Sequence, residues 1–356
     1  MGKLILSLNV GSTSVKSKLF AVEKENKLRE IFSWSESNLR ENVKKEAILR
    51  RFFSCLEKNG FADQVTGVAH RVVHGGEMRK SVFIDGRLIS FLHRISHLAP
   101  LHNPFNLEGI VFSRLHWPKA KQIAVFDTAL FADLPEAARL YPIPLAVSKR
   151  YSLRRYGFHG ISHKGAIACA EKALGQSKKD RKIITVHLGG GASATAVKNG
   201  RVLDTSMGFT PLEGLMMSTR AGDLDPGIIF YLMRQKVRPE RIESMLLRES
   251  GFLGMSHCSN MLELISGVEK GERQSTLAFE MFVYRIQKYI GAYFAVLGGC
   301  DALVFTGSIG AGKSVTRREI VKPFKKNLLK NTKILVHPTA EEKTMAEEWL
   351  KLNSLV

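Results

Sequence analysis

At 356 residues the chain is longer than one hydrophobic core usually serves, so we expect two domains, and 44% hydrophobic with 24% charged residues excludes a disordered protein. The formal net charge of +20 fits nucleic acid or small anions, but the basic residues are dispersed and no nucleic-acid module is recognisable, which favours small anions. Four scattered cysteines without a C-x-x-C pair, no signal peptide and no apolar run of about 18 residues predict a cytoplasmic protein without zinc, disulfides or a membrane span.

The N-terminal half begins with a predicted β-hairpin. Residues 3–20, KLILSLNVGSTSVKSKLF, form an apolar run, a Gly/Ser-rich turn and a second run of alternating small and apolar residues. Helical periodicity follows in residues 45–60 and ends at a glycine. Residues 64–76 and 121–130 are typical of strands; the first ends in a Gly-Gly turn and the second carries Asp127 at its carboxyl end.

The C-terminal half begins with a similar pattern. Residues 182–202, KIITVHLGGGASATAVKNGRV, repeat the order of apolar run, glycine-rich turn and second run about half a chain later, as a duplicated domain would. We expect a long, largely apolar helix over 276–299 and a buried strand over 301–308. Another strand at 333–338 and an amphipathic helix from about Glu341 complete the chain.

Strands that alternate with helices in two similar halves predict an α/β protein with two domains. We place the first domain at 1–130, with the helix at 341–356 packed back on it, and the second at 131–340.

The two glycine-rich turns, residues 11–14 and 189–191, expose several backbone N–H groups, and two such turns facing each other would bind a polyphosphate from both sides. The alternative is that each turn is a hairpin tip that needs glycine and binds nothing.

Polar residues at strand ends and inside glycine-rich turns form the candidate site of an α/β protein. Two arginines, an aspartate, an asparagine and histidines, together with two phosphate-type turns, describe phosphoryl transfer, although a lone histidine in such a place is more often structural. No Ser-His-Asp order, HExxH or EF-hand pattern competes with this interpretation. The candidates are Asn9, Arg71, His74, His102, Asp127, His159 and Arg220.

Residues 304–318, VFTGSIGAGKSVTRR, contain another phosphate-type pattern. Gly307–Ser314 match G-x-x-x-x-G-K-[ST] after an apolar strand, as in P-loop proteins. A P-loop domain goes on to supply an apolar strand ending in a Walker-B aspartate, and the short remainder of the chain has none. We therefore expect this segment to be one loop of a different nucleotide site.

Lys313 either reaches the phosphates or points to solvent, and solvent is the expectation because most lysines are exposed.

Seven segments, in order along essentially the whole chain, are similar to acetate kinase motifs. They are LSLNVGSTSVK (6–16), AHRVVHGGE (69–77), LAPLHNP (98–104), VFDTA (125–129), RRYGFHGISH (154–163), VHLGGGAS (186–193) and DTSMGFTPLEGLMMSTRAGDLDP (204–226). The chain therefore resembles the acetate kinases of the acetate and sugar kinase/Hsc70/actin superfamily. The resemblance implies an α/β fold of two ribonuclease-H-like (actin-like ATPase) domains with a nucleotide cleft between them, Mg²⁺ as cofactor and a homodimer.

The resemblance also implies a role for each matching residue near the reacting groups. Asp127 is the position called catalytic in the family, His159 donates a hydrogen bond to the transition state with His102 nearby, and Arg220 clamps the transferring phosphoryl group. Arg71 would hold the carboxylate or acetyl phosphate. The small apolar pocket for the acyl group would consist of Val73, Leu101, Phe158 and Pro211.

On the nucleotide side, the resemblance implies that Asn9 and Glu341 hold the Mg²⁺ ion. The residues implied to contact the nucleotide are Asn9, Ser12, Lys16, His187, Leu188, Gly189, Gly190, Gly191, Asn260, Met261, Leu262, Ser308, Ile309, Gly310, Ala311 and Gly312. A carboxylate substrate is already ionised at pH 7 and needs no strong general base. We therefore expect Asp127 to orient Arg220 or a metal-bound water rather than to abstract a proton.

Four departures from the family matter, and three of them lie on the nucleotide side. A segment between residues 318 and 333 is missing, and the second turn contains HLGGG where acetate kinases usually have HLGNG. The Asp-aromatic/Met-Arg triplet of the adenine site is replaced by MSHCSNMLELIS (255–266), which has no arginine. The GIGENS loop is replaced by residues 307–314, GSIGAGKS. These changes predict an altered or weakened nucleoside preference with retained phosphoryl chemistry.

The leading hypothesis is direct in-line phosphoryl transfer, ATP + acetate (or propionate) ⇌ ADP + acetyl phosphate. The alternative is a degenerate paralogue that binds nucleotide or acyl phosphate and acts as a sensor or binding protein. The preferred acid stays open because one methylene contributes only about 1–3 kcal/mol of discrimination. The expected partners are a small carboxylate, ATP and a second copy of the chain, with neither nucleic acid nor membrane.

Overall fold

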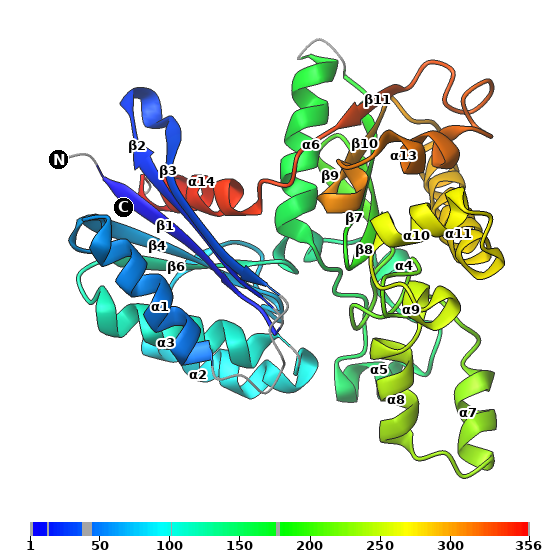
Figure 1. Ribbon diagram of the computed structural model, residues 1–356, viewed down its shortest axis with the longest axis horizontal. Helices are drawn as coiled ribbons and strands as arrows, with labels where there is room; N and C mark the ends of the chain where they lie inside the picture. Colours follow the sequence, from blue (N-terminus) through cyan, green and yellow to red (C-terminus); the bar gives the residue numbers. More distant parts are fainter. Residues whose placement is uncertain (1–2, 13, 38–44, 101, 176–178, 355–356) are drawn as a thin grey trace. The chain divides into compact units, whose positions relative to one another are not determined.

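The computed structural model describes residues 3–12, 14–37, 45–100, 102–175 and 179–354 (Figure 1). The chain divides into two compact units, and each contains one sheet. The first unit comprises residues 1–132, 159–161 and 340–356, and the second unit comprises 133–158 and 162–339. The C-terminal segment thus returns to the unit in which the chain begins.

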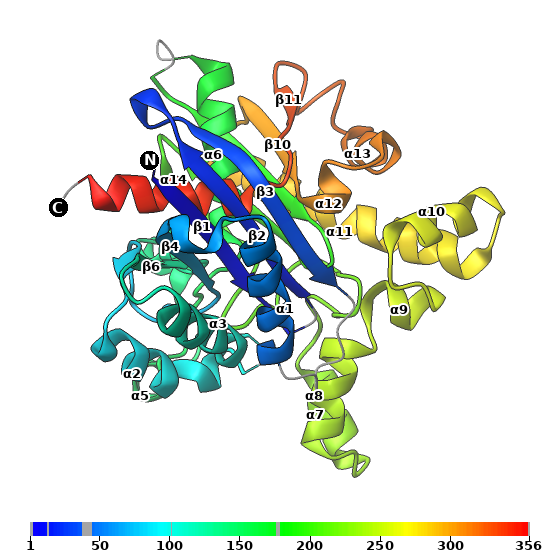
Figure 2. The same ribbon diagram turned by 60° about the vertical axis from the view of Figure 1, so that its left-hand side comes forward.

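Six strands form the sheet of the first unit: β1 (Leu4–Val10), β2 (Ser14–Val22), β3 (Leu28–Ser37), β4 (Val65–Val72), β5 (Val82–Phe83) and β6 (Lys121–Phe126). Their order is β3-β2-β1-β4-β6-β5 (Figure 2). β1, β2 and β3 form an antiparallel meander, whereas β1, β4 and β6 run parallel. The carboxyl ends of three parallel strands therefore meet at one edge of this sheet.

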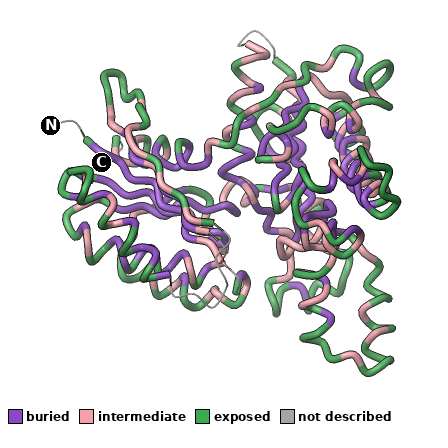
Figure 3. Tube along the Cα trace, in the orientation of Figure 1, coloured by how far each residue is buried: buried purple, intermediate pink, exposed green. Residues whose placement is uncertain are grey.

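Helices cover both faces of the first sheet (Figure 1): α1 (Lys45–Lys58), α2 (Gly86–Ile95) and α3 (Asn103–His116) lie on one face, and α14 (Glu341–Asn353) on the other. Alternation along β1 explains the two layers, because successive side chains of a strand point to opposite faces. Leu6 and Leu8 belong to the core beneath α1, whereas Ile5 packs with Trp349 of α14. β1 is consequently buried along its whole length (Figure 3).

Five strands form the sheet of the second unit: β7 (Lys182–Leu188), β8 (Ala192–Lys198), β9 (Arg201–Thr205), β10 (Ala302–Thr306) and β11 (Lys333–Val336). Their order is β11-β10-β7-β8-β9, with an antiparallel meander β7-β8-β9 and parallel β7, β10 and β11. This order repeats β6-β4-β1-β2-β3 of the first unit. The duplicated α/β architecture expected from the two glycine-rich hairpins is therefore confirmed.

Two long helices flank the second sheet on opposite sides, α6 (Gly160–Leu174) and α11 (Arg273–Leu297) (Figures 1 and 2). α11 packs against β7, β8 and β9, and it ends at Gly298, whose φ of 66° and N–H bond to the Ala295 carbonyl form a left-handed cap. The shorter helices are α4 (Glu136–Arg139), α5 (Leu145–Tyr151), α7 (Gly227–Arg234), α8 (Pro239–Arg248), α9 (Gly251–Ser256), α10 (Met261–Glu269), α12 (Gly307–Gly310) and α13 (Ser314–Val321).

The predicted strand over 64–76 is shorter in the structure, where β4 ends at Val72. The next two N–H groups leave the ladder because side chains of α3 accept them: Asn106 Oδ1 from Val73 and Asn103 Oδ1 from His74, both at 3.0 Å. Polar side chains thus stop the strand where the candidate site begins. In the described part of the chain, no helix combines the length and apolar character that a membrane crossing requires.

Gly67 of β4 is expected to be essential for the docking of α14. A Cβ at this position would collide with the indole ring of Trp349, whose Nε1 donates to the Lys121 carbonyl at 2.7 Å. Gly67→Ala should lower the free energy of unfolding by about 1–3 kcal/mol through overpacking, measured by urea denaturation. Gly86→Ala is the matched control, because a Cβ there meets nothing within 4 Å. Equal stability of the two variants would contradict this account of the α14 interface.

Candidate functional site

In the first unit the predicted residues gather at the carboxyl ends of the parallel strands. The register pairs Ser7 with Ala69 and Ala69 with Ile123, so Asn9, Arg71 and Asp127 follow with the same parity on one face of the sheet. Lys16 lies directly opposite Asn9 on the antiparallel neighbour and shares this face. This is the face that α14 covers. The arrangement is the strand-end site that open α/β sheets usually build.

Arg71 is the centre of this cluster. Its Nη2 and Nε donate to Asp127 Oδ2 at 2.6 and 3.1 Å, and its Nη1 lies 3.3 Å from Glu341 Oε2. Burial disfavours the charge of the guanidinium, but the two carboxylates outweigh it and raise the pKa of Arg71 above its usual value. One arginine therefore ties β4, the residue after β6 and the first residue of α14 together as an ionic network.

The Asp127 carboxylate is fully enclosed by protein. Burial raises the pKa of Asp127 above its usual value, and Arg71 opposes this rise. Its Oδ1 atom is buried and has no partner of full hydrogen-bond geometry among the described residues, although the Ile161 N–H faces the carboxylate. Within this unit the arginine that pairs with Asp127 is Arg71, and the expectation that Asp127 orients Arg220 or a metal-bound water stays a prediction.

His159 belongs to the first unit and has a constrained backbone conformation. The residue has a φ of 59°, in the left-handed region that non-glycine residues adopt only at a cost. The following Gly160 donates its N–H to the Asp127 carbonyl at 3.0 Å, and a Cβ on Gly160 would collide with that same carbonyl oxygen. Strained residues of this kind cluster at functional sites. The turn thus fixes His159 beside the chain segment that carries Asp127.

Two asparagines that sequence reasoning missed hold the loops of the first unit in place. Asn106 Nδ2 donates to the Val10 carbonyl at 2.8 Å while its Oδ1 accepts from Val73, so one side chain joins the ends of β1 and β4. Asn103 bonds both the N–H and the carbonyl of His74. The only signal in the sequence was the pair of asparagines in the 98–106 segment, whose partners are distant in the chain.

In the second unit the triple-glycine turn lies beside the loop after β10. Gly307 has a φ of 84°, and a Cβ on it would collide with the Leu188 carbonyl at the end of β7. The Gly189 N–H donates to the Gly191 carbonyl at 2.8 Å, and the Ser218 N–H donates to the Gly190 carbonyl at 3.2 Å. Residues 187–191, 307–310 and the segment of Arg220 therefore converge at one edge of the second sheet, as parallel β7 and β10 require.

Arg220 is held without a counter-charge in the described part of the chain. Its Nη1 donates to the Pro211 carbonyl at 3.0 Å and lies 3.8 Å from the Met217 sulfur, and no carboxylate pairs with it. The side chain is half-buried in accessible area, yet protein atoms surround its guanidinium, and this desolvation lowers the pKa of Arg220 to about 10. A desolvated cation without an anion partner is the local arrangement expected of an anion site.

A second polar network supports the segment that carries Pro211 and Arg220. Arg155 donates to Glu213 Oε1 at 2.6 Å and to the Thr205 carbonyl at 3.0 Å, and the Tyr141 hydroxyl donates to the other Glu213 oxygen. Burial raises the pKa of Tyr141, and the charge of Glu213 adds to this rise. None of these side chains was singled out from the sequence, because their partners lie in segments that are remote along the chain.

His187 is oriented by a neighbour from α6. Its Nδ1 pairs with Ser162 Oγ at 2.8 Å, and the adjacent His163 bridges Thr185 Oγ1 and Ser193 Oγ, both at 2.8 Å. Burial lowers the pKa of His163 well below its usual value, with His187 adding to the effect. His163 therefore joins α6 to β7 and β8, whereas His187 stands at the end of β7, next to the glycine turn.

The residues expected around the nucleoside carry little polar side-chain functionality. Asn260 is the N-cap of α10, where its Oδ1 accepts the Glu263 N–H at 2.9 Å, Met261 is buried and Leu262 is 61% exposed. Lys313 is exposed at the N-cap position of α13 and makes no capping bond, in line with its expected solvent position. Arg317, which sequence reasoning missed, donates to the Gly310 and Gly312 carbonyls at 2.7 Å and fixes this loop.

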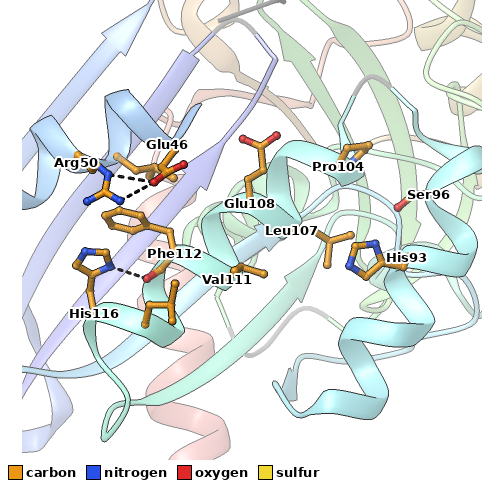
Figure 4. Close-up of a pocket in the computed structure, with 12 residues that line it drawn as sticks. Glu46, Arg50, His93, Ser96, Pro104, Leu107, Glu108, Val111, Phe112 and His116 are labelled. Carbon is orange, nitrogen blue, oxygen red and sulfur yellow. Dashed lines mark hydrogen bonds and ion pairs between the residues drawn. The ribbon is translucent and has the colours of Figure 1, made fainter. Parts of the chain in front are cut away.

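The remaining predicted residues take less distinctive places. Val73 and Phe158 are buried, and His102 is the N-cap residue of α3, whereas Leu101 lies outside the described residues. A groove of about 690 Å³ between α1, α2 and α3 is lined by apolar and polar side chains, among them the Glu46–Arg50 ion pair (Figure 4). None of the predicted site residues lines this groove.

Comparisons with known proteins agree with this arrangement. The sequence profile of the Acetokinase family matches residues 4–334. The chain is 44% identical over 335 residues to an acetate kinase of Sulfurovum sp. (strain NBC37-1), covering 89% of this chain and 85% of that protein. It is 38% identical over 394 residues to the acetate kinase of Carboxydothermus hydrogenoformans, covering 98% of each. Because this alignment is longer than the 356 residues here, the relative contains residues that this chain lacks.

Solved structures give the same result. A propionate kinase from Francisella tularensis subsp. tularensis SCHU S4 superposes with a TM-score of 0.86 at 34% identity, covering 97% of this chain and 98% of that one. An acetate kinase from Porphyromonas gingivalis superposes with a TM-score of 0.83 at 32% identity, covering 99% and 100%. With sequence and fold matched over nearly the whole length, the chain belongs to the Acetokinase family.

Proposed function

We propose that this chain transfers a phosphoryl group between ATP and acetate or propionate, forming ADP and the acyl phosphate. The family and its acetate kinase and propionate kinase members support a phosphotransferase that acts on a carboxyl group. Within the chain itself, the observation that carries the proposal is Arg220, a desolvated guanidinium with no carboxylate partner among the described residues. Such a group is suited to receive the negative charge of a phosphoryl group in transfer.

The chemistry needs charge neutralisation more than proton transfer. The substrate carboxylate is ionised at neutral pH and attacks a phosphorus that already carries negative oxygens, so two anions must approach in line. Arg71, oriented by Asp127 and Glu341, would hold the carboxylate, and His159 would donate a hydrogen bond to the transferring group. Asp127 then orients the Arg71 guanidinium and neither accepts nor donates a proton in the reaction.

The chain also fits Mg²⁺ as the cofactor. Among the described residues no cluster of three or more His, Cys, Asp or Glu side chains is placed to hold a metal, which is consistent with an ion bound mainly by nucleotide phosphates and water. Asn9 has no side-chain hydrogen bond in the described residues, and Glu341 lies on the same face of the sheet. These two side chains would hold the ion, which when bound would neutralise part of the phosphate charge.

A degenerate paralogue that binds ligand without turnover is the second candidate. The observation that favours it is the nucleoside side, where Asn260 is committed to a helix cap and Met261 is buried. A hydroxamate assay for acetyl phosphate with ATP, acetate and Mg²⁺ separates the two functions. Accumulation of the hydroxamate supports the enzyme, and its absence with an intact fold supports the binding protein. We further propose that the protein acts in the cytoplasm.

Asp127→Asn should lower kcat/KM for acetate by at least about 100-fold, the scale of losing one well-oriented electrostatic contact. The physical reason is that Asn cannot balance the charge of Arg71, so the guanidinium loses its fixed orientation. The shape of the pH–rate profile between about pH 6 and pH 8 should stay the same, because Asp127 transfers no proton. Asp63→Asn, at an exposed position of the same unit, is the control. Loss of one ionisation from the profile in Asp127→Asn would establish a proton-transfer role instead.

Nucleoside selectivity should be low. Because no ionic side chain stands among residues 260–262 and 308–312, kcat/KM for ATP and GTP should differ by less than about tenfold, the factor that 1.4 kcal/mol of differential binding produces. Steady-state assays with ATP, GTP and pyrophosphate at saturating acetate measure this, and the KM for acetate should be constant across donors. A strict preference for ATP with an ordinary KM would contradict the prediction.

A homodimer is proposed from the family resemblance, and α7 of the second unit supports it. This helix has no buried residue, and Ile228, Phe230, Tyr231 and Met233 are each at least 46% exposed. Covering such a face is a usual reason for self-association. Phe230→Glu should shift the molar mass measured by light scattering from dimer to monomer. Leu115→Glu, at an exposed position of α3 in the first unit, should leave the dimer intact; dissociation of this control alone would place the interface elsewhere.

A further inference from the structure

Lys45, the first residue of α1, is a fully buried lysine next to the first glycine-rich turn. Its Nζ donates to the Ser12 carbonyl at 2.6 Å and lies 5.1 Å from the centroid of the Phe105 ring. Lysine is among the residues most rarely buried, because an ammonium group loses its hydration unless protein groups replace it. Here the replacement is a backbone carbonyl of the turn and an aromatic face.

An acidic side chain lies on the helix side of the Lys45 ammonium. Glu108 on α3 faces the start of α1; burial raises the pKa of its carboxyl, whereas Lys45 lowers it through both its charge and its backbone N–H. Glu46, the other carboxylate at the start of α1, pairs with Arg50 at 2.6 Å (Figure 4). Lys45 thus carries a positive charge to the base of the turn, with its acidic neighbour on the helix side.

The described residues of this turn, Gly11, Ser12 and Ser14, suit the binding of an anion. A carbonyl oxygen pointing into such a turn would repel phosphate, but three of them already accept hydrogen bonds: Val10 from Asn106 Nδ2, Ser12 from Lys45 Nζ, and Ser14 from the Gly11 N–H. No described residue accepts from the Ser12 N–H or bonds its hydroxyl. The donors of Ser12 are therefore available while its acceptor is occupied.

We propose that Lys45 is a positioning residue for the polyphosphate of the nucleotide: it fixes the Ser12 carbonyl so that the donors of Ser12 meet phosphate oxygens, and it adds positive charge behind the turn. This inference rests on the proposed function in taking residues 11–14 as a phosphate turn. It differs from a purely structural role in one measurable respect. Its effect should follow the phosphates of the donor and leave the acid substrate and the nucleoside untouched.

The test compares Lys45→Met, which keeps the aliphatic stem and removes the ammonium, with Lys58→Met, an exposed lysine of the same helix. In Lys45→Met the KM for ATP should rise about tenfold, equivalent to about 1.4 kcal/mol, while the KM for acetate changes less than about twofold. Isothermal titration calorimetry should show about tenfold weaker binding of ATP and unchanged binding of adenosine. Lys58→Met should match the wild type in every measurement.

Three outcomes would overturn the proposal. The first is a wild-type KM for ATP in Lys45→Met. The second is an equal loss of affinity for ATP, adenosine and acetate together with a lower unfolding temperature, which would identify Lys45 as a structural residue. If Lys45→Met does not fold, Lys45→Gln, which keeps a donor but no charge, takes its place; unchanged ATP affinity in that variant is the third. A wild-type protein that makes no acetyl phosphate would refute the proposed function alone, since the ATP and adenosine titrations still decide the role of Lys45.

Discussion

The ionic fork of Arg71 is the interaction on which the first unit depends. Its two arms join three chain segments that are remote in sequence: β4, the residue after β6, and the start of α14 through Glu341. Taking three charges out of water is unfavourable unless each finds a partner, so the cluster exists only when all three segments are in place. The same contacts therefore determine both the fold of the first unit and the geometry of its candidate site. α14 can contribute Glu341 only because Gly67 leaves room for the indole of Trp349.

The surroundings of Arg220 in the second unit are the opposite of those of Arg71. Arg71 has two carboxylates and a raised pKa, whereas Arg220 has a carbonyl and a thioether and a pKa lowered to about 10. The difference is physical, because a neutralised guanidinium is a fixed donor and an uncompensated one retains its full attraction for an anion. The polar network of Arg155, Tyr141 and Glu213 ties the segment that carries Arg220 to other parts of the second unit.

The features that could be predicted from the sequence are those that local residue patterns determine. Two apolar hairpins with glycine turns predicted two sheets of one topology, and strand ends predicted where Asn9, Arg71 and Asp127 lie. It did not predict the side chains whose partners are distant backbone atoms, such as Asn106 between the ends of β1 and β4, or Arg317 on the Gly310 carbonyl. A hydrogen bond of this kind leaves no periodicity in the sequence, and its partner is known only once the strands are placed.

The P-loop-like pattern at Gly307–Ser314 shows why a motif match needs its structural context. Gly307 is glycine because its φ is 84° and a Cβ would strike the Leu188 carbonyl, and a Cβ on Gly312 would lie 2.6 Å from the Ser308 carbonyl oxygen. The first requirement comes from packing the end of β10 against the end of β7, and the second comes from the path of the loop itself. The glycines that match the P-loop pattern are thus explained by local packing, Gly307 by the parallel β7–β10 pair and Gly312 by the loop. The same pair places this loop beside the triple-glycine turn, so the position of the loop follows from the β7–β10 pairing and needs no P-loop fold.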